Sequence, residues 1–190
     1  NRRLRRLTPI APAPNTSPLS ISRAAAWRNL PRQPDRTYKP RPRAAQPKGL
    51  NMSKIAVVYW SGTGNTEALA NKIYESAKSF GKDVQIFTAG EFSEDKVDEF
   101  DTVIYGCPSM GCEQLEDFEF EPMFESCKPK LKDKSIALFG SYGWGGGEWM
   151  RQWEDDCRSI GANLIFESII CNDAPDDEAL SKCEELAKTL

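Results

Sequence analysis

A short turn at 61–66, with the sequence SGTGNT, joins an apolar run at 55–60 to a segment with helical periodicity. The apolar run predicts a buried parallel strand, and the helix that follows presents the positive end of its dipole to the turn. Two glycines permit positive φ and close backbone approach, while hydroxyl and amide side chains can bond phosphate oxygens. The turn contains no Lys or Arg. It therefore predicts a phosphate site of neutral donors, formed by Ser61, Gly62, Thr63, Gly64, Asn65 and Thr66.

Two other kinds of phosphate loop fit this turn less well. A nucleoside-triphosphate loop ends in Gly-Lys followed by Ser or Thr, whereas Gly64 is followed by Asn65. A dinucleotide fingerprint needs a third Gly or Ala where this chain has Glu67, whose charge opposes a pyrophosphate. A monophosphate is the better match. Taken alone, the turn is equally compatible with an ordinary strand-to-helix connection that binds nothing.

Two further apolar runs are each followed by a loop that contains glycine, as the first run is. The run at 101–106 leads into the loop at 107–113, and the run at 135–140 leads into the loop at 141–147. Loops at the carboxyl ends of parallel strands meet at the ligand-binding edge of an open α/β sheet. Met110 and Trp144, one in each loop, are suited to pack against the two faces of a flat ring. A phosphate beside a flat ring indicates flavin mononucleotide (FMN).

The residues from Met52 to Leu190 resemble a flavodoxin of the short-chain kind found in anaerobic bacteria. The resemblance rests on three motifs at matching spacing, YWSGTGNT at 59–66, GCPSMG at 106–111 and LFGSYGWG at 138–145. It implies a low-potential electron carrier with non-covalent FMN that cycles between semiquinone and hydroquinone, and not an enzyme with catalytic residues. The partners implied are ferredoxin- or flavodoxin-type reductases and acceptors with basic surfaces.

The resemblance also implies roles for single residues. The turn at 61–66 would hold the phosphate, and Glu113 would bond the pyrimidine edge of the ring. Met110 would flank the inner ring face and Trp144 the outer face. The peptide between Gly111 and Cys112 would turn its carbonyl toward flavin N5 during reduction. Outside the turn, the implied cofactor contacts are Pro108, Ser109, Met110, Gly111, Cys112, Glu113, Ser141, Tyr142, Gly143, Trp144 and Gly145.

Apolar and helical segments alternate over the whole of 52–190, which predicts one α/β domain. Right-handed crossovers favour a doubly wound, five-stranded parallel sheet of order 2-1-3-4-5, the flavodoxin-like fold. The expected strands lie at 55–60, 83–88, 101–106, 134–140 and 163–170, and the expected helices at 65–80, 93–100, 114–126, 147–160 and 176–190.

The chain contains no histidine, which excludes Ser-His-Asp hydrolysis and imidazole-bound metals. Its six cysteines form no Cys-x-x-Cys pair, so we expect reduced thiols and no metal site. Cys107 ends an apolar strand and is interpreted as a core residue. Cys112 stands where many flavodoxins carry Asp, Asn or Ser, which bears on the turning peptide. Pro108 stands where some carry Ser, which removes a hydroxyl from the phosphate site.

Charge is distributed unevenly along the chain. Residues 1–51 carry a net charge of +11, and residues 52–190 a net charge of −14. Six acidic residues lie between 113 and 125, directly after the second loop. Such a run is commonly a solvated helix face. Beside an exposed flavin edge, however, it would attract basic partners and oppose further negative charge on the flavin.

Residues 1–51 contain nine prolines and ten arginines without apolar periodicity, so we expect a disordered basic extension. A transit peptide, a nucleic-acid-binding tail and a segment that folds back on the acidic domain are compatible with this composition. Because Met52 begins the flavodoxin-like part, we favour an extension without function and no nucleic-acid partner. No transmembrane or secretory segment is found, and we expect a cytoplasmic monomer that does not bind membranes.

Two alternatives from other classes stay open. A flavodoxin-fold, FMN-dependent NAD(P)H or quinone reductase shares the fold but would need more loop length for a second substrate. In a binding module that never holds flavin, Met110 and Trp144 would be core residues. A Trp among glycines is poorly placed for core packing, which weakens this second alternative.

Overall fold

The computed structural model describes residues 53–190, so the extension expected at 1–51 lies outside the described residues. The strands form one parallel sheet of order β2-β1-β3-β4-β5, which confirms the predicted order. The strands are β1 (Lys54–Tyr59), β2 (Asp83–Thr88), β3 (Thr102–Gly106), β4 (Ser135–Tyr142), β5 (Asn163–Leu164) and β6 (Ile169–Asn172).

The predicted fifth strand is divided into two segments, β5 and β6, which both pair with β4. Asn163 lies opposite Ser135 whereas Ile169 lies opposite Phe139, so the register shifts by two residues between the segments. The N–H of Ile165 still donates to the carbonyl of Ile136 at 2.9 Å, and residues 166–168 then leave the ladder. Hydropathy does not reveal the interruption, because apolar residues occur on both sides of it and within it.

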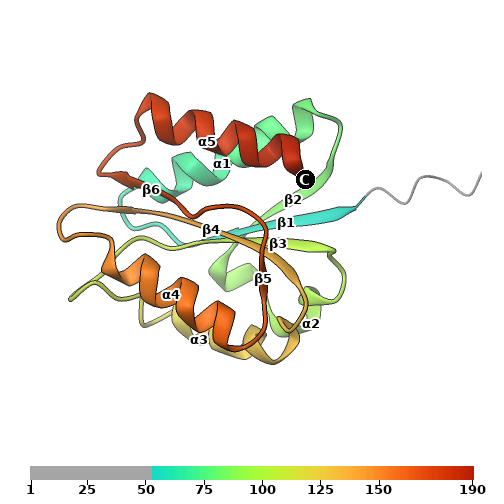
Figure 1. Ribbon diagram of the computed structural model, residues 1–190, viewed down its shortest axis with the longest axis horizontal. Coiled ribbons are helices and arrows are strands. Elements are labelled where there is room, and N and C mark those ends of the chain that lie inside the picture. Colours follow the sequence, from blue (N-terminus) through green and yellow to red (C-terminus); the bar gives the residue numbers. More distant parts are fainter. Residues whose placement is uncertain (1–52) are drawn as a thin grey trace, which may run out of the picture. The chain divides into compact units, whose positions relative to one another are not determined.

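Helices cover both faces of the sheet (Figure 1). The helices are α1 (Asn65–Ser79), α2 (Glu94–Val97), α3 (Phe120–Cys127), α4 (Glu148–Ser159) and α5 (Asp177–Thr189), with short 3₁₀ helices at Ala89–Glu91 and Lys128–Lys130. α1 and α5 lie on one face, and α2, α3 and α4 on the other. Ile55 and Val57 of β1 belong to the hydrophobic core under α1 and α5, whereas Ala56 and Val58 belong to the core under α2, α3 and α4. This double burial explains why the first strand is apolar throughout.

α3 begins at Phe120 and not at the predicted residue 114. Met110 and Gln114 exchange backbone hydrogen bonds of 2.8 and 2.9 Å, which hold the chain in a turn before the helix. The carboxylate of Glu116 then accepts the backbone N–H groups of residues 118–120. A side chain, and not a helical carbonyl, satisfies these donors, so the segment before Phe120 is not helical.

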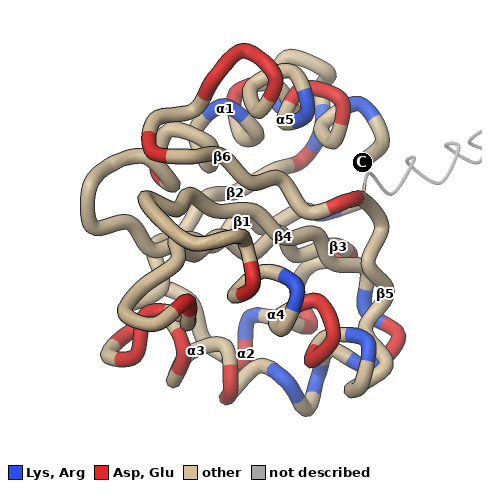
Figure 2. Tube along the Cα trace, turned by 60° about the vertical axis from the view of Figure 1, so that its left-hand side comes forward, with Lys and Arg blue, Asp and Glu red and all other residues tan. Residues whose placement is uncertain are grey.

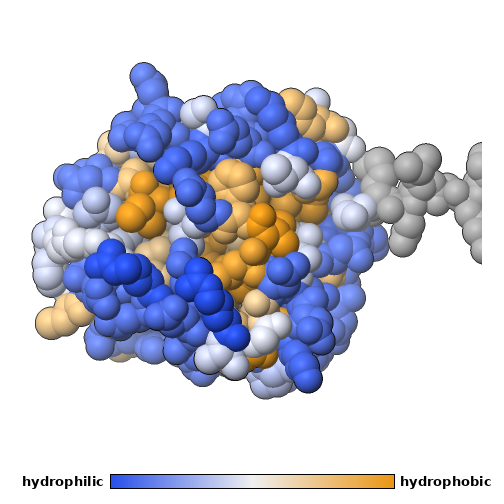
Figure 3. Space-filling model, viewed as in Figure 1, coloured by the Kyte–Doolittle hydropathy of each residue, from blue (hydrophilic) through white to orange (hydrophobic). Residues whose placement is uncertain are grey.

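An apolar strip crosses one face of the domain between the polar helix layers (Figure 3). The edge segments β5 and β6 lie in front in this view. Ile170 of β6 is 38% exposed, and Leu164 and Ile165 are half-buried. Among residues 53–190, no helix is long and apolar enough to cross a membrane.

Candidate functional site

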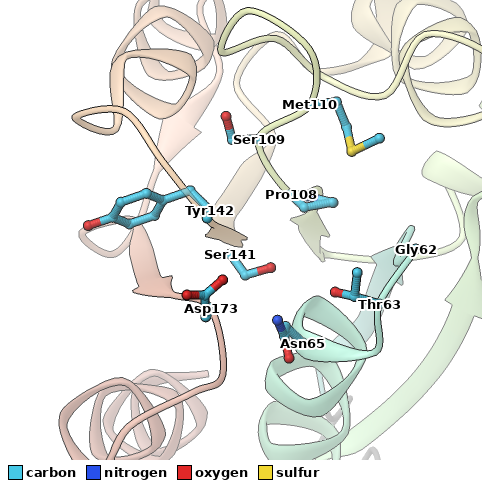
Figure 4. A pocket seen from close by; sticks show the side chains of 10 residues that line it. Gly62, Thr63, Asn65, Pro108, Ser109, Met110, Ser141, Tyr142 and Asp173 are labelled. Carbon is cyan, nitrogen blue, oxygen red and sulfur yellow. The ribbon is translucent and has the colours of Figure 1, made fainter.

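Four loops at the carboxyl edge of the sheet surround a cavity of about 320 Å³ (Figure 4). Three of them are the loops predicted from sequence, after β1, β3 and β4, and the fourth follows β6. The lining residues are Gly62, Thr63, Asn65, Pro108, Ser109, Met110, Ser141, Tyr142, Gly143 and Asp173. The other predicted residues lie in the same loops but outside the lining, namely Ser61, Gly64, Thr66, Gly111, Cys112, Glu113, Trp144 and Gly145.

The first loop leaves backbone donors without protein partners. Gly64 has a φ of +90°, which glycine adopts freely, and α1 begins directly after it. Ser61 Oγ accepts the N–H of Gly64 at 3.0 Å and holds the turn closed. Within the described residues, no protein acceptor meets the backbone N–H of Asn65, Thr66 or Glu67. Unpaired N–H donors at the positive end of a helix are suited to an anion.

A buried hydrogen bond joins the first loop to the third. Thr66 Oγ1 and Ser141 Oγ are 2.9 Å apart, and both residues are buried. The Thr66 hydroxyl, which the sequence motif assigns to a phosphate, is therefore paired with another hydroxyl here. Ser141 also lines the cavity, and its hydroxyl can both donate and accept. Ser141 is thus able to contact a ligand while it stays bonded to Thr66.

The second loop, after β3, is a tight turn. The backbone bridge that starts at Met110 encloses three residues, of which Gly111 and Glu113 have φ values of +49° and +55°. The N–H of Ser109 donates to the carbonyl of Ser141 at 2.8 Å, which fixes the start of this loop against β4. Figure 4 shows the thioether of Met110 at one end of the cavity. The second loop is therefore held on both sides of Met110.

One carboxylate oxygen of Glu113 caps the N-terminus of α4. Its Oε1 atom accepts the backbone N–H groups of Gly146, Gly147 and Glu148 at 3.0, 2.9 and 3.0 Å. A Cβ atom on Gly145 would lie 2.4 Å from this oxygen, and Gly145 has a φ of +93°. Glu113 thus joins the second loop to the third, a contact that the sequence motif does not predict. Its Oε2 atom has no hydrogen-bond partner among residues 53–190.

Trp144 and Met110 are surface residues, with exposed fractions of 62% and 38%. This exposure contradicts the alternative in which both are core residues of a binding module. Tyr142 at the start of the third loop packs on Trp149, with ring centroids 5.5 Å apart. The backbone that leads into Trp144 is therefore anchored, while the indole ring is free to meet a ligand.

Asp173 lines the cavity although no sequence motif selects it. It has a φ of +55°, and its backbone N–H donates to the carbonyl of Tyr142 at 2.7 Å. Figure 4 shows its carboxylate beside Ser141, and no other residue of the described lining is charged. The rule that ligands gather after the carboxyl ends of strands applies to the fifth strand too, so this rule offered a signal for Asp173.

Five of the six cysteines are buried, and Cys112 in the second loop is exposed. Cys107 is fully buried, which confirms it as a core residue, and burial raises the pKa of its thiol. Burial also raises the pKa of Cys157 and Cys183 to about 12 and that of Cys171 to about 11. These thiols are protonated at neutral pH and are poor nucleophiles.

The sequence profile described as Flavodoxin matches residues 57–186. The flavodoxin of Megasphaera elsdenii is 46% identical over 134 residues, which cover 70% of this chain and 96% of that protein. The flavodoxin of Clostridium beijerinckii is 42% identical over 136 residues, which cover 72% of this chain and 98% of that protein. The chain belongs to the flavodoxin family.

Solved flavodoxin structures share the fold. The solution structure of two-electron reduced Megasphaera elsdenii flavodoxin has a TM-score of 0.65 over 70% of this chain and 98% of that one. Oxidised Flavodoxin 2 from Bacillus cereus, 28% identical, has a TM-score of 0.63 over 72% of this chain and 96% of that one. As a flavodoxin, this protein is an electron carrier that uses FMN, and not an enzyme. None of these relatives favours the reductase alternative.

The donor set of the cavity fits the FMN of flavodoxins. FMN carries one phosphate, a hydroxylated chain and a flat ring. Free backbone N–H groups at the start of α1 and the hydroxyls of Thr63 and Ser141 are suitable donors for the phosphate. Met110 and Trp144 are exposed and suit a ring. The carboxylate of Asp173 is the one charged group of the described lining, which contains no Lys or Arg, and it is unsuited to contact an anion.

Proposed function

We propose that this flavodoxin holds FMN between its four loops, with the phosphate at the N-terminus of α1. The observation that carries the proposal is the set of unpaired backbone N–H groups at 65–67, next to a cavity lined by the hydroxyls of Thr63 and Ser141. Such donors at a helix N-terminus suit an anion without a balancing cation. In this arrangement the whole turn at 61–66 forms the site. Ser61 and Gly64 contribute by holding the turn closed, and the other residues contribute backbone or side-chain donors.

We assign the flat ring to the space between Met110 and Trp144, with contacts from 108–113 and 141–145. A thioether and an indole are suited to opposite faces of such a ring, and the exposure of both supports the assignment. Glu113 has an unpaired Oε2 atom that is able to accept an N–H from the pyrimidine edge. The positive φ of Gly111 supports a peptide that can turn at the Gly111–Cys112 bond.

FMN supplies the electron-transfer chemistry, and the protein sets the energy at which negative charge is added. A carboxylate ~10 Å away, at an effective dielectric of ~20–40, opposes such charge by about 1–2 kcal/mol before salt screening. For a one-electron step, 1.4 kcal/mol corresponds to about 59 mV. The acidic run at 113–125 and a phosphate without a cation both oppose the addition of negative charge to the flavin and therefore lower its reduction potential. We therefore propose a low-potential carrier that passes one electron at a time.

The negative charge of the domain also favours binding to partner proteins with basic surfaces. Residues 52–190 carry a net charge of −14, and we propose that this domain meets redox proteins with basic surfaces, such as ferredoxin- or flavodoxin-type reductases and acceptors. We also propose that the protein is a monomer. We propose a cytoplasmic location because the described cysteines are unpaired thiols, which suit a reducing compartment. Residues 52–190 form the functional domain in this proposal, and residues 1–51 are an extension without function.

A redox titration of the FMN-loaded protein tests this function. We expect two separate one-electron steps, of which the second has the lower potential. A single two-electron wave contradicts the proposed one-electron carrier. NADPH added alone should leave the flavin oxidised, whereas rapid bleaching of its absorbance would support a reductase.

A further inference from the structure

Phe118 is the most exposed large apolar side chain of the described domain, with an exposed fraction of 85%. Exposed Phe80, at 41%, comes next among the phenylalanines. Single exposed apolar residues are common on protein surfaces. Phe118 differs because its backbone is fixed and its neighbours in sequence are all acidic.

The turn that carries Phe118 is held by a buried carboxylate. Glu116 is 4% exposed, and its Oε1 atom accepts the N–H of Phe118 at 3.0 Å. Its Oε2 atom accepts the N–H groups of Glu119 and Phe120 at 2.8 Å each, and its own N–H donates to Cys107 Sγ at 3.3 Å. Phe120 is fully buried. The surrounding structure therefore imposes the outward position of Phe118, which is not the result of a loose loop.

Carboxylates surround Phe118 without compensating cations. Asp117, Glu119 and Glu121 are exposed, and no Lys or Arg of residues 53–190 forms an ion pair with them. No Lys or Arg occurs anywhere between 107 and 127. Figure 2 shows acidic segments gathered at the start of α3. We call Asp117, Phe118, Glu119 and Glu121 the Phe118 surface. Its charge repels a second copy of itself and attracts a basic protein.

We propose that Phe118 is the apolar anchor of a docking surface for a basic redox protein whose docking face has an apolar pocket rimmed by Lys or Arg. This inference rests on the proposed function, because the Phe118 surface follows the second loop, which borders the cofactor cavity. In such an interface, carboxylates at the rim speed association, and a desolvated aromatic anchor slows dissociation. Substitution of the carboxylates should therefore change mainly the association rate, and substitution of Phe118 mainly the dissociation rate.

The experiment measures association and dissociation rates of the full chain loaded with FMN, with a ferredoxin/flavodoxin-type reductase of basic docking face as the probe. Phe118→Ser should raise the dissociation constant about tenfold, mainly through faster dissociation, with unchanged salt dependence. Asp117→Asn combined with Glu119→Gln should slow association and flatten its salt dependence. Phe80→Ser is the matched control, because Phe80 follows the last turn of α1, about 20 Å along the helix from the cavity.

Three results would overturn the inference. They are an unchanged dissociation constant for Phe118→Ser, an effect no larger than that of Phe80→Ser, and no measurable binding of the reductase to the unmodified protein. Titration of each variant with FMN distinguishes these results from a failure of the proposed function. Phe118→Ser should bind FMN as tightly as the unmodified protein does. If the unmodified protein takes up no FMN, the proposed function fails, and rate measurements with the flavin-free protein still test the Phe118 surface.

Discussion

The backbone N–H of Gly147 lies 2.9 Å from Oε1 of Glu113, so a single carboxylate oxygen links the second loop to the start of α4. The contact is charge-assisted, because the carboxylate meets the positive end of a helix. The two loops that would enclose a flavin ring are thus positioned by the protein's own residues. A ligand does not have to pay the whole cost of ordering them.

Gly145→Ala should disturb this link. A Cβ atom at this position would lie 2.4 Å from Glu113 Oε1, and the φ of +93° is unfavourable for alanine. We expect a loss of about 2–4 kcal/mol in the free energy of unfolding, together with weaker FMN binding. Chemical denaturation measures the first effect. Gly146→Ala is the matched control, because a Cβ there meets no atom closer than 3.9 Å. Equal losses in the two variants would show that the link is not responsible.

Glu116 should make stability depend on acid pH. Burial raises the pKa of its carboxyl, but hydrogen bonds from the N–H groups of Phe120, Glu119 and Phe118 outweigh burial and hold the pKa below the usual value of a glutamate. Because the folded pKa is lower than the unfolded one, the stabilisation is fully present above about pH 4.5 and is lost as the pH falls through the lowered value.

Glu116→Gln tests this dependence. We expect the variant to be about 1–2 kcal/mol less stable than the unmodified protein at pH 7, and the difference to shrink at pH 3. Urea denaturation at the two pH values measures both numbers. Glu125→Gln, on the exposed side of α3, is the control and should change little. A difference that is the same at both pH values would contradict the assignment of the pH effect to Glu116.

The buried pair of Thr66 and Ser141 should act as one unit. Thr66→Val and Ser141→Ala each leave the other hydroxyl without its partner at 2.9 Å, and we expect each to cost about 1–2 kcal/mol. The double variant should cost about 1 kcal/mol less than the two single effects together. Denaturation of the four proteins completes the cycle. Strict additivity would mean that the bond contributes nothing to stability.

Asp173→Asn removes the one negative charge of the described cavity lining. Because the phosphate of FMN is also negative, we expect its affinity to rise about three- to tenfold, while riboflavin, which lacks the phosphate, is unaffected. Fluorescence titration with both flavins measures this, and Asp177→Asn in the first turn of α5 is the control. Weaker binding of both flavins would instead make the carboxylate an acceptor for ligand hydroxyls.

The sequence predicted the sheet order and the three principal loops, because buried parallel strands are apolar on both faces and end in distinctive turns. It did not predict that the fifth strand is divided, since the shift of register between Asn163 and Ile169 leaves no mark on hydropathy. The late start of α3 was also missed. Glu116 replaces helical carbonyls as the acceptor there, a local side-chain-to-backbone contact that hydrophobic periodicity does not show.

At the site, the motifs predicted the loops but not how their side chains pair. The hydroxyl of Thr66 bonds Ser141, and Glu113 bonds the start of α4, in each case between residues far apart in the chain. Asp173 follows a strand whose end carries no glycine-rich turn, so no motif drew attention to it. Long-range side-chain contacts depend on packing geometry, which spacing along the chain does not specify.

The central claim is tested most directly by titrating the flavin-free protein with FMN and with riboflavin, with the quenching of flavin fluorescence as the measure of binding. Neutral donors at the N-terminus of α1 should bind FMN with one-to-one stoichiometry and a dissociation constant below about 1 μM, and riboflavin at least about tenfold more weakly, since hydrogen bonds to a charged phosphate contribute about 1.5–3 kcal/mol each. No uptake of FMN at micromolar concentrations, or equal affinity for the two flavins, would contradict the account.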